Sequence, residues 1–344
     1  MDDWQPRTVK PSPQGFFSRR TGWTALLMSL ALVAIIGLSL SQGSVSINGP
    51  ELWQAILHRG SEVNQTIIWE LRLPRVIAAL VVGAALGASG ALMQGMLRNG
   101  LASPFLLGIS AGAGLVAVTL LSLGFWQQWV PLGAWLGAML TTLFVYLLAR
   151  QGSTLSVERL LLGGVAVSAL FGALQSALLL ISDDGRVQSA LTWLVGSLNG
   201  RGWQEVQIAG PYVLIALIFS CLLASSINLL NLGDDLSVGL GLSPLRARAL
   251  IGATAALLAA GAVSMAGLIG FVGLIVPHGV RLLVGTDYRV VLPFSAVGGA
   301  FVLAFADLLS RLGTVELPVG IVTAFLGSPV FIWLLYRRSG MGGV

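Results

Sequence analysis

The sequence predicts an all-α polytopic membrane protein with about ten transmembrane helices. Its 344 residues are 56% hydrophobic and only 10% charged, and the mean hydropathy is +0.88. A soluble globular domain carries about 25% charged residues. Apolar runs of about 20 residues, the length of a helical span, recur along the chain. The 44 glycines favour the close approach of helices in lipid.

The first 21 residues are expected to form a polar tail, and the run from Gly22 to Leu40 the first transmembrane helix. That run is too long for the core of a cleaved signal peptide. A piece at 187–198 is too short to span and is expected to be a re-entrant or surface helix. Further spans are predicted at about 76–97, 105–124, 129–149, 160–181, 205–226, 245–264, 267–285, 290–311 and 318–336.

No linker divides the chain, so residues 22–337 are predicted to form a single transmembrane domain, with a tail at 338–344. Ten spans place both termini on one side of the membrane, and most of the 19 Lys and Arg residues fall on that side. Because cytoplasmic loops carry an excess of basic residues, we expect both termini to be cytoplasmic. The basic residues are scattered singly at span ends, which indicates no nucleic-acid partner.

A polar break at 229–244 interrupts the apolar runs of the C-terminal half and carries two adjacent carboxylates, Asp234 and Asp235. It is framed by two Leu-Gly steps, Leu232-Gly233 and Leu240-Gly241. Apolar residues between turn residues predict a short helix, and the two aspartates suit its positively polarised N-terminus. On the orientation above, this helix lies in the cytosol. It is either a docking element for a cytosolic partner or an ordinary surface loop.

Arg72 and Arg75 flank the outer end of the second span, separated by Leu73-Pro74. Because Pro74 suits the first turn of a helix, both guanidinium groups are expected near the surface. They either snorkel to the interface or dock an anionic partner, since arginine pairs bidentately with carboxylates. Arg311 is expected on the same side, where Asp307, four residues earlier on the same helix face, predicts an internal ion pair.

The sequence contains no recognisable catalytic constellation. Its two histidines, His58 and His278, are far apart, and it has no Cys/His cluster for a metal and no phosphate-binding loop. The glycine-rich stretches at 87–90 and 108–114 lie in apolar spans, which favours helix packing over nucleotide binding. We therefore expect a transporter rather than an enzyme, with no cofactor or metal, driven by another polypeptide or by an ion gradient.

Several stretches together resemble the FecCD/BtuC-type permeases, the membrane subunits of binding-protein-dependent ABC importers for ferric siderophores, haem and cobalamin. The similarity runs from about Glu51 to Arg337. It is carried by LRLPRVIAALVVGAALGASGALMQGMLRNGLASPFLLGISAGA (71–113), GLIGFVGLIVPHGVRLLVGTDYRVVLP (267–293), ADLLSRL (306–312) and ELPVGIVTAFLGSPVFIWLL (316–335). The resemblance implies the type II ABC importer permease fold in an inner (plasma) membrane.

The resemblance also implies partners: two cytosolic ATPase subunits, a periplasmic substrate-binding protein and a second permease subunit, identical or homologous. It implies that residues 232–242 couple to the ATPase, and that Arg72, Arg75 and Arg311 meet carboxylates of the binding protein. The expected cargo is an iron–siderophore complex, with haem or cobalamin as alternatives on the same fold. An ion-coupled secondary transporter is the alternative from another class.

Overall fold

The computed structural model describes residues 19–43, 45–124, 127–151 and 154–339. Within them, seven helices are long and apolar enough to cross a membrane, and three shorter apolar helices bring the total to the predicted ten. Most of the predicted N-terminal tail, and the last five residues of the C-terminal one, lie outside the described residues. The first helix begins at Arg19, three residues before the predicted start.

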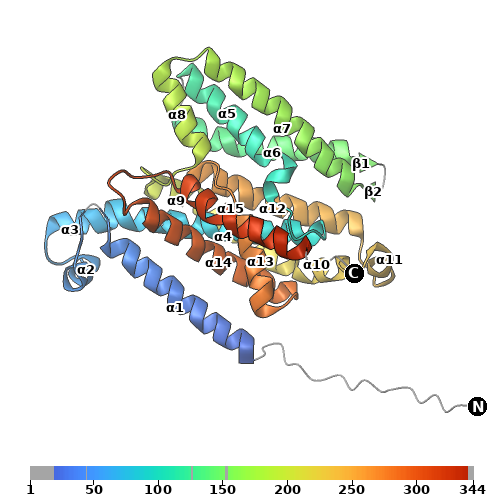
Figure 1. Ribbon diagram of the computed structural model, residues 1–344, viewed down its shortest axis with the longest axis horizontal. Coiled ribbons are helices and arrows are strands. Elements are labelled where there is room, and N and C mark those ends of the chain that lie inside the picture. Colours follow the sequence, from blue (N-terminus) through green and yellow to red (C-terminus); the bar gives the residue numbers. More distant parts are fainter. Residues whose placement is uncertain (1–18, 44, 125–126, 152–153, 340–344) are drawn as a thin grey trace, which may run out of the picture.

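In these ranges the chain is mostly helical, with one hairpin of two two-residue strands (Figure 1). The elements in order are α1 Arg19–Ser41, α2 Gly49–Ile56, α3 Glu62–Thr66, the π-helix η1 Ile67–Arg72, α4 Leu73–Met96, the 3₁₀ helix η2 Pro104–Leu107, α5 Ile109–Leu123, the 3₁₀ helix η3 Gln127–Trp129, α6 Val130–Ala149, β1 Arg150–Gln151, β2 Thr154–Leu155, α7 Val157–Leu180, α8 Asp184–Val195, α9 Trp203–Leu222, α10 Ala224–Leu230, α11 Asp234–Gly239, α12 Pro244–Ala266, α13 Val272–Val284, α14 Tyr288–Ser310 and α15 Val319–Ser339.

The centre of the molecule is α4, and its glycines explain how closely its neighbours approach. A Cβ on Gly83 would lie 2.3 Å from the carbonyl oxygen of Gly299 on α14, and one on Gly90 would lie 1.8 Å from that of Gly273 on α13. Side chains on these glycines would therefore force the helices apart. The interpretation of residues 87–90 as a helix-packing stretch is confirmed.

A second group of helices, α5 to α8, lies beside this centre (Figure 1). Gly112 of α5 faces α6, because a Cβ there would lie 2.4 Å from the carbonyl oxygen of Gly137. Gln175 of α7 donates a hydrogen bond of 3.0 Å to the carbonyl oxygen of Ala111 on α5. The glycine-rich stretch at 108–114 therefore also serves helix packing, as the sequence predicted.

Three predicted segments have bounds that differ from the structure, and residues with positive φ explain two of these differences. The span expected at 267–285 becomes helical only at Val272, because Gly267 and Phe271 adopt φ values of +72° and +67°. The surface helix expected at 187–198 begins at Asp184 and ends before Gly196, whose φ is +81°. The span expected at 205–226 ends at Leu222, and the separate helix α10 follows it.

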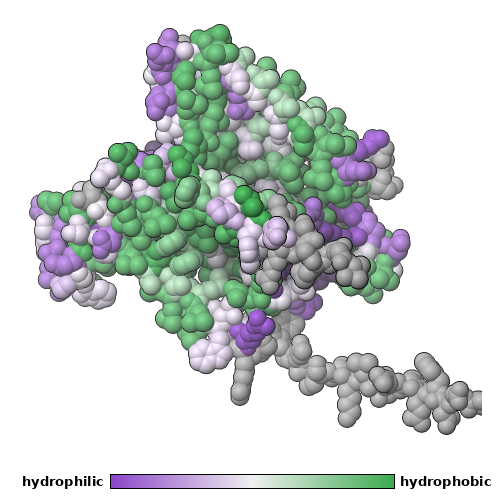
Figure 2. Space-filling model, in the orientation of Figure 1, coloured by the Kyte–Doolittle hydropathy of each residue, from purple (hydrophilic) through white to green (hydrophobic). Residues whose placement is uncertain are grey.

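The molecule has a hydrophobic middle and two ends that are more hydrophilic (Figure 2). The start of α1, the end of α15, the hairpin and α11 lie toward one of them, here called the α11 end (Figure 1). The opposite, or α3, end carries α2 and α3. Exposed leucines, isoleucines and valines cover α1, α6, α7 and α9 between the ends, which fits burial in lipid.

Candidate functional site

The break at 229–244 folds into a short helix, α11, held between two tight turns. Gly233 precedes the helix at φ +113° and Gly241 follows it at φ +85°, a region that strongly favours glycine. No atom lies within 4 Å of a Cβ built on either residue, so backbone conformation rather than space requires glycine there. Inside the helix, the buried Ser237 donates a hydrogen bond of 2.8 Å to the carbonyl oxygen of Asp234.

The two aspartates of α11 have different surroundings. Asp234 accepts two hydrogen bonds of 2.9 Å from the guanidinium group of Arg248 on α12, and it is also paired with Arg98, just beyond α4. Asp235 is exposed. Asp234 therefore ties α11 to both α4 and α12, whereas Asp235 faces outward.

The two arginines set the protonation of Asp234. Burial alone would raise the pKa of this carboxyl group, but the hydrogen bonds and charge of Arg248, and then those of Arg98, outweigh it and hold the pKa below its usual value. Asp234 is therefore ionised at physiological pH, where its contacts with Arg248 and Arg98, here called the Asp234 clamp, are intact. Arg98 adopts φ +49°, a backbone conformation that costs free energy for a residue other than glycine. An arginine at this position has a side chain long enough to reach Asp234.

Apolar side chains are exposed in and beside α11 although it belongs to a hydrophilic end of the molecule. Leu236 and Val238 of the helix and the flanking Leu232 and Leu240 retain more than half of their maximal exposure: Leu232 53%, Leu236 62%, Val238 58% and Leu240 61%. Exposed apolar side chains in one small patch, rimmed by charge, are typical of a protein interaction site. The sequence predicted this helix and its two aspartates, but not the two arginines that hold it.

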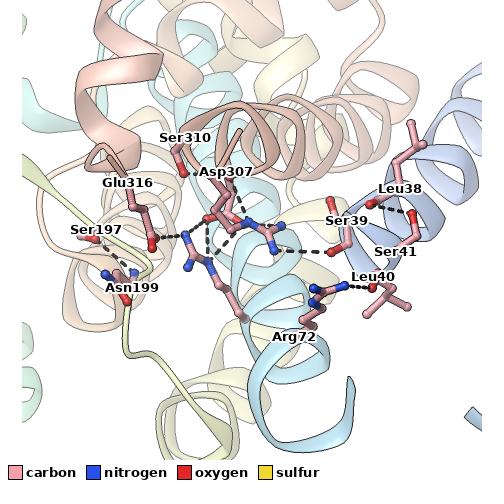
Figure 3. A network of polar contacts seen from close by, with 12 residues as sticks. Leu38, Ser39, Leu40, Ser41, Arg72, Ser197, Asn199, Asp307, Ser310 and Glu316 are labelled. Carbon is pink, nitrogen blue, oxygen red and sulfur yellow. Dashed lines mark hydrogen bonds and ion pairs between the residues drawn. The ribbon is translucent and has the colours of Figure 1, made fainter. Parts of the chain in front are cut away.

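At the α3 end, Arg75 and Arg311 bind Asp307, and Arg72 lies beside them (Figure 3); these three arginines are called the arginine cluster. Arg75 of α4 donates to Asp307 of α14 through Nε at 3.0 Å and Nη2 at 2.8 Å. Arg311 pairs with the other carboxylate oxygen at 3.0 Å. The predicted ion pair between Asp307 and Arg311 is confirmed, and Asp307 also holds an arginine 232 positions away in the sequence.

The expected position of the Arg72 and Arg75 guanidinium groups near the surface is wrong. The side chains of Arg75 and Arg311 retain 12% and 9% of their exposure, and Arg72 is buried. Arg72 donates to the carbonyl oxygen of Leu40 at 2.6 Å and to that of Val45, which turns it toward the segment after α1. Buried cations require such partners, because an unpaired charge away from water is costly.

Glu316, in the loop before α15, completes the cluster. Its Oε1 lies 2.6 Å from Nη2 of Arg75, and its side chain retains 34% exposure against 1% for Asp307. Three arginines and two carboxylates leave one net positive charge on the cluster. The pairing of Arg75 with Asp307 and Glu316 was not predicted, because these residues are distant in the sequence and only the packing of α4 against α14 brings them together.

A cavity of about 1210 Å³ adjoins the cluster. It lies among α6, α8 and α9, and Glu316 forms part of its wall together with the polar residues Ser197, Asn199 and Arg201. Arg201 is paired there with Glu205 at 3.5 Å. Among the described residues, no three His, Cys, Asp or Glu side chains are grouped so that they could hold a metal ion.

Comparison with known proteins decides the family. The model of the FecCD transport family matches residues 30–337. The chain belongs to the FecCD transport family.

Relatives in this family cover nearly the whole chain. The hemin transport system permease protein HmuU of Yersinia pestis is 38% identical over 329 residues, which covers 91% of this chain and 96% of that protein. The Fe(3+)-citrate import system permease protein YfmE of Bacillus subtilis is 38% identical and covers 90% and 93%. The vitamin B12 import system permease protein BtuC of Vibrio cholerae is 40% identical and covers 88% and 93%.

The fold has a solved counterpart, described as an inward-facing conformation of a metal-chelate type ABC transporter. It superposes with a TM-score of 0.85 at 31% identity and covers 92% of this chain and 99% of that one. The FecCD chain is therefore a permease subunit of an ABC importer, and the ATPase is a separate subunit. The ion-coupled alternative is not favoured.

Proposed function

We propose that this FecCD permease forms, with a second permease subunit, the translocation path of an importer that carries an iron–siderophore complex across the inner membrane. A periplasmic binding protein delivers the complex at the α3 end, and two cytosolic ATPase subunits act at the α11 end. The relatives named for hemin, Fe(3+)-citrate and vitamin B12 support a bulky cargo of the metal-chelate kind. Hemin and cobalamin are the alternative cargoes.

The observation that carries the proposal is the construction of α11. Its exposed leucines and valine offer an apolar contact surface to an ATPase, while Asp234 fixes the helix to α4 and α12. An ordinary connection between two spans needs neither feature. In this proposal Leu232, Gly233, Asp234, Asp235, Leu240 and Gly241 form the coupling element, with the glycines fixing the turns and Asp234 transmitting displacement.

The path of that displacement follows α4. At one end of α4, Arg98 pairs with Asp234 of α11; at the other end, Arg75 belongs to the arginine cluster. With 24 residues, α4 is about 36 Å long, and its glycine contacts with α13 and α14 make it the rigid centre of the subunit. A movement imposed on α11 by closure of the ATPase dimer therefore reaches the outer cluster through one helix.

Docking of the binding protein is proposed at Arg72, Arg75 and Arg311. In the isolated permease, these arginines are largely neutralised by Asp307 and Glu316 or hydrogen-bonded to backbone. Carboxylates of the binding protein then compete for guanidinium groups that already have partners. Because existing contacts must be exchanged for new ones, docking gains orientation and limited affinity, which suits a partner that must leave after each delivery.

The test is uptake into proteoliposomes that contain the permease with its second subunit and ATPase. We expect accumulation of an iron–siderophore complex only when ATP, the ATPase and the loaded binding protein are all present. Uptake under an ion gradient without the ATPase would overturn the importer mechanism. Accumulation of hemin or cobalamin in place of the iron complex would overturn the cargo alone.

Two matched variants test the contact with the ATPase. Leu236→Glu places a charge on the apolar face of α11 and should weaken association with the ATPase at least tenfold. Leu312→Glu places the same charge on an equally exposed leucine at the α3 end, with 58% exposure against 62%, and should leave association unchanged. Equal effects of the two variants would remove α11 from the interface.

A further inference from the structure

Arg75 is held by two carboxylates that differ in how firmly they are anchored. Asp307 lies within α14 and is paired with both Arg75 and Arg311. Glu316 lies outside any helix, and its ion pair with Arg75 is the contact that the structure gives its side chain among the described residues. Its partial exposure means that water or another carboxylate can reach the Arg75–Glu316 contact, whereas the Arg75–Asp307 contact is closed off.

The loop that carries Glu316 is loosely fixed. Residues 312–318 have no helical structure, and Val315 and Leu317 retain 71% and 48% of their exposure. Two backbone hydrogen bonds tie the loop to the end of α14: the amide of Leu312 donates to the carbonyl oxygen of Leu309 at 3.3 Å, and the amide of Leu317 donates to that of Ser310 at 3.0 Å. A segment with few buried contacts opens locally at low cost in free energy.

The side chain of Glu316 borders a cavity that it can enter when it leaves Arg75. It forms part of the wall of the 1210 Å³ cavity, where Asn199 and Arg201 are fellow wall residues. Figure 3 shows Glu316 beside Ser197 and Asn199, on the side of Asp307 opposite Arg72. Arg201 is held by a single long contact of 3.5 Å to Glu205. A Glu316 side chain that leaves Arg75 therefore faces a cavity whose wall includes polar groups and a second arginine.

From these contacts we propose that Glu316 is an internal competitor: it occupies Arg75 in the undocked permease, and a carboxylate of the binding protein displaces it on docking. Asp307 is then a positioning residue, which keeps Arg75 and Arg311 in place during the exchange. Displacement of Glu316 raises the net charge of the cluster by one unit while the arriving carboxylate restores it. This inference rests on the proposed docking role of the arginines.

The competitor makes docking weaker than the bare arginines would allow. The Arg75–Glu316 contact must break before Arg75 can bind a carboxylate of the binding protein. One arginine–carboxylate contact replaces another, so the exchange is nearly balanced in free energy. That balance favours release of the empty binding protein after delivery, because Glu316 recaptures Arg75. Removal of the Glu316 charge should therefore tighten docking and slow dissociation.

The experiment measures binding of the substrate-free cognate binding protein to the permease–ATPase complex in nanodiscs, by surface plasmon resonance. Glu316→Gln keeps the size of the side chain and removes its charge, and we expect affinity to rise three- to tenfold, mainly through slower dissociation. Glu316→Asp keeps the charge on a shorter side chain and should give an intermediate gain. The matched control is Glu70→Gln, which removes a charge from an exposed position five residues before Arg75.

The outcomes separate this inference from the docking proposal. Unchanged or weaker binding by both Glu316 variants, while Arg75→Ala abolishes binding, would overturn the competitor role and leave the docking site standing. An equal gain from Glu70→Gln would show that general repulsion, not competition for Arg75, is responsible, and would also overturn it. Unchanged binding by Arg75→Ala would overturn the docking site itself.

Discussion

At the scale of single residues, Asp234 and its neighbour Asp235 show how context separates two identical side chains. Asp234 carries a bidentate contact to Arg248 and a second pairing with Arg98, whereas Asp235 is exposed. Their adjacency in the sequence marks both as candidates for a coupling role. In the proposed coupling role, Asp234 would supply the structural part, because it alone of the two is held by arginines.

This contrast gives a prediction. Asp234→Asn removes the charge that binds both arginines, and we expect ATP hydrolysis to continue while substrate uptake per ATP hydrolysed falls at least fivefold. Asp235→Asn removes an identical charge from the same helix turn but leaves both arginine contacts intact, so it should lower this ratio less than Asp234→Asn does. The measurement is parallel ATPase and uptake rates in proteoliposomes. Normal coupling in Asp234→Asn would mean that α11 acts without its clamp.

At the scale of elements, α4 owes its central place to glycine rather than to large apolar side chains. Backbone carbonyl groups of α13 and α14 occupy the space where side chains at Gly90, Gly87 and Gly83 would stand. Contacts of this kind replace the hydrophobic effect, which does not drive helices together within lipid. Because these contacts leave α4 little room to move against its neighbours, we expect it to be rigid. A rigid α4 can transmit a displacement from Arg98 at one end to Arg75 at the other.

We therefore expect Gly90→Ala to lower the free energy of unfolding by about 1–3 kcal/mol, the range for overpacking a close contact. Its Cβ would lie 1.8 Å from a backbone oxygen that no rotamer change can move away. Gly172→Ala is the matched control on α7, where no atom lies within 4 Å of the added Cβ. Unfolding in mixed detergent micelles measures both variants. Equal stability would show that α13 yields to the methyl group at no cost.

At the scale of the whole molecule, the two ends have different functions to perform across the membrane. The α11 end is proposed to face the cytosol together with both termini, and the α3 end to face the periplasm. The excess of Lys and Arg expected on the side of the termini supports this orientation. Arg98, Arg248 and the hairpin residue Arg150 lie toward the α11 end.

The orientation can be tested with two cysteine variants in a Cys221→Ser background. In right-side-out vesicles, a membrane-impermeant thiol reagent should label Leu71→Cys at the α3 end, whose parent side chain is 61% exposed. Leu236→Cys on α11 should be labelled only in inside-out vesicles, and less when the ATPase is bound. The opposite pattern of labelling would invert the proposed sides.

The sequence alone determined the class of protein, the ten apolar helices and the position of the short helix α11. Each depends on local composition: runs of apolar residues set the spans, and glycines around two aspartates set α11. The sequence also predicted the Asp307–Arg311 pair, since residues four apart on a helix lie on one face.

Only the tertiary structure decided which distant charges meet. Arg75 reaches Asp307 and Glu316 because α4 packs against α14, and Asp234 reaches Arg98 and Arg248 because α11 folds back between α4 and α12. The same packing buries Arg72 and Arg75, which the local sequence pattern predicted to lie near the surface. Burial of a charge depends on which helices surround it, and no periodicity within a single segment contains that information.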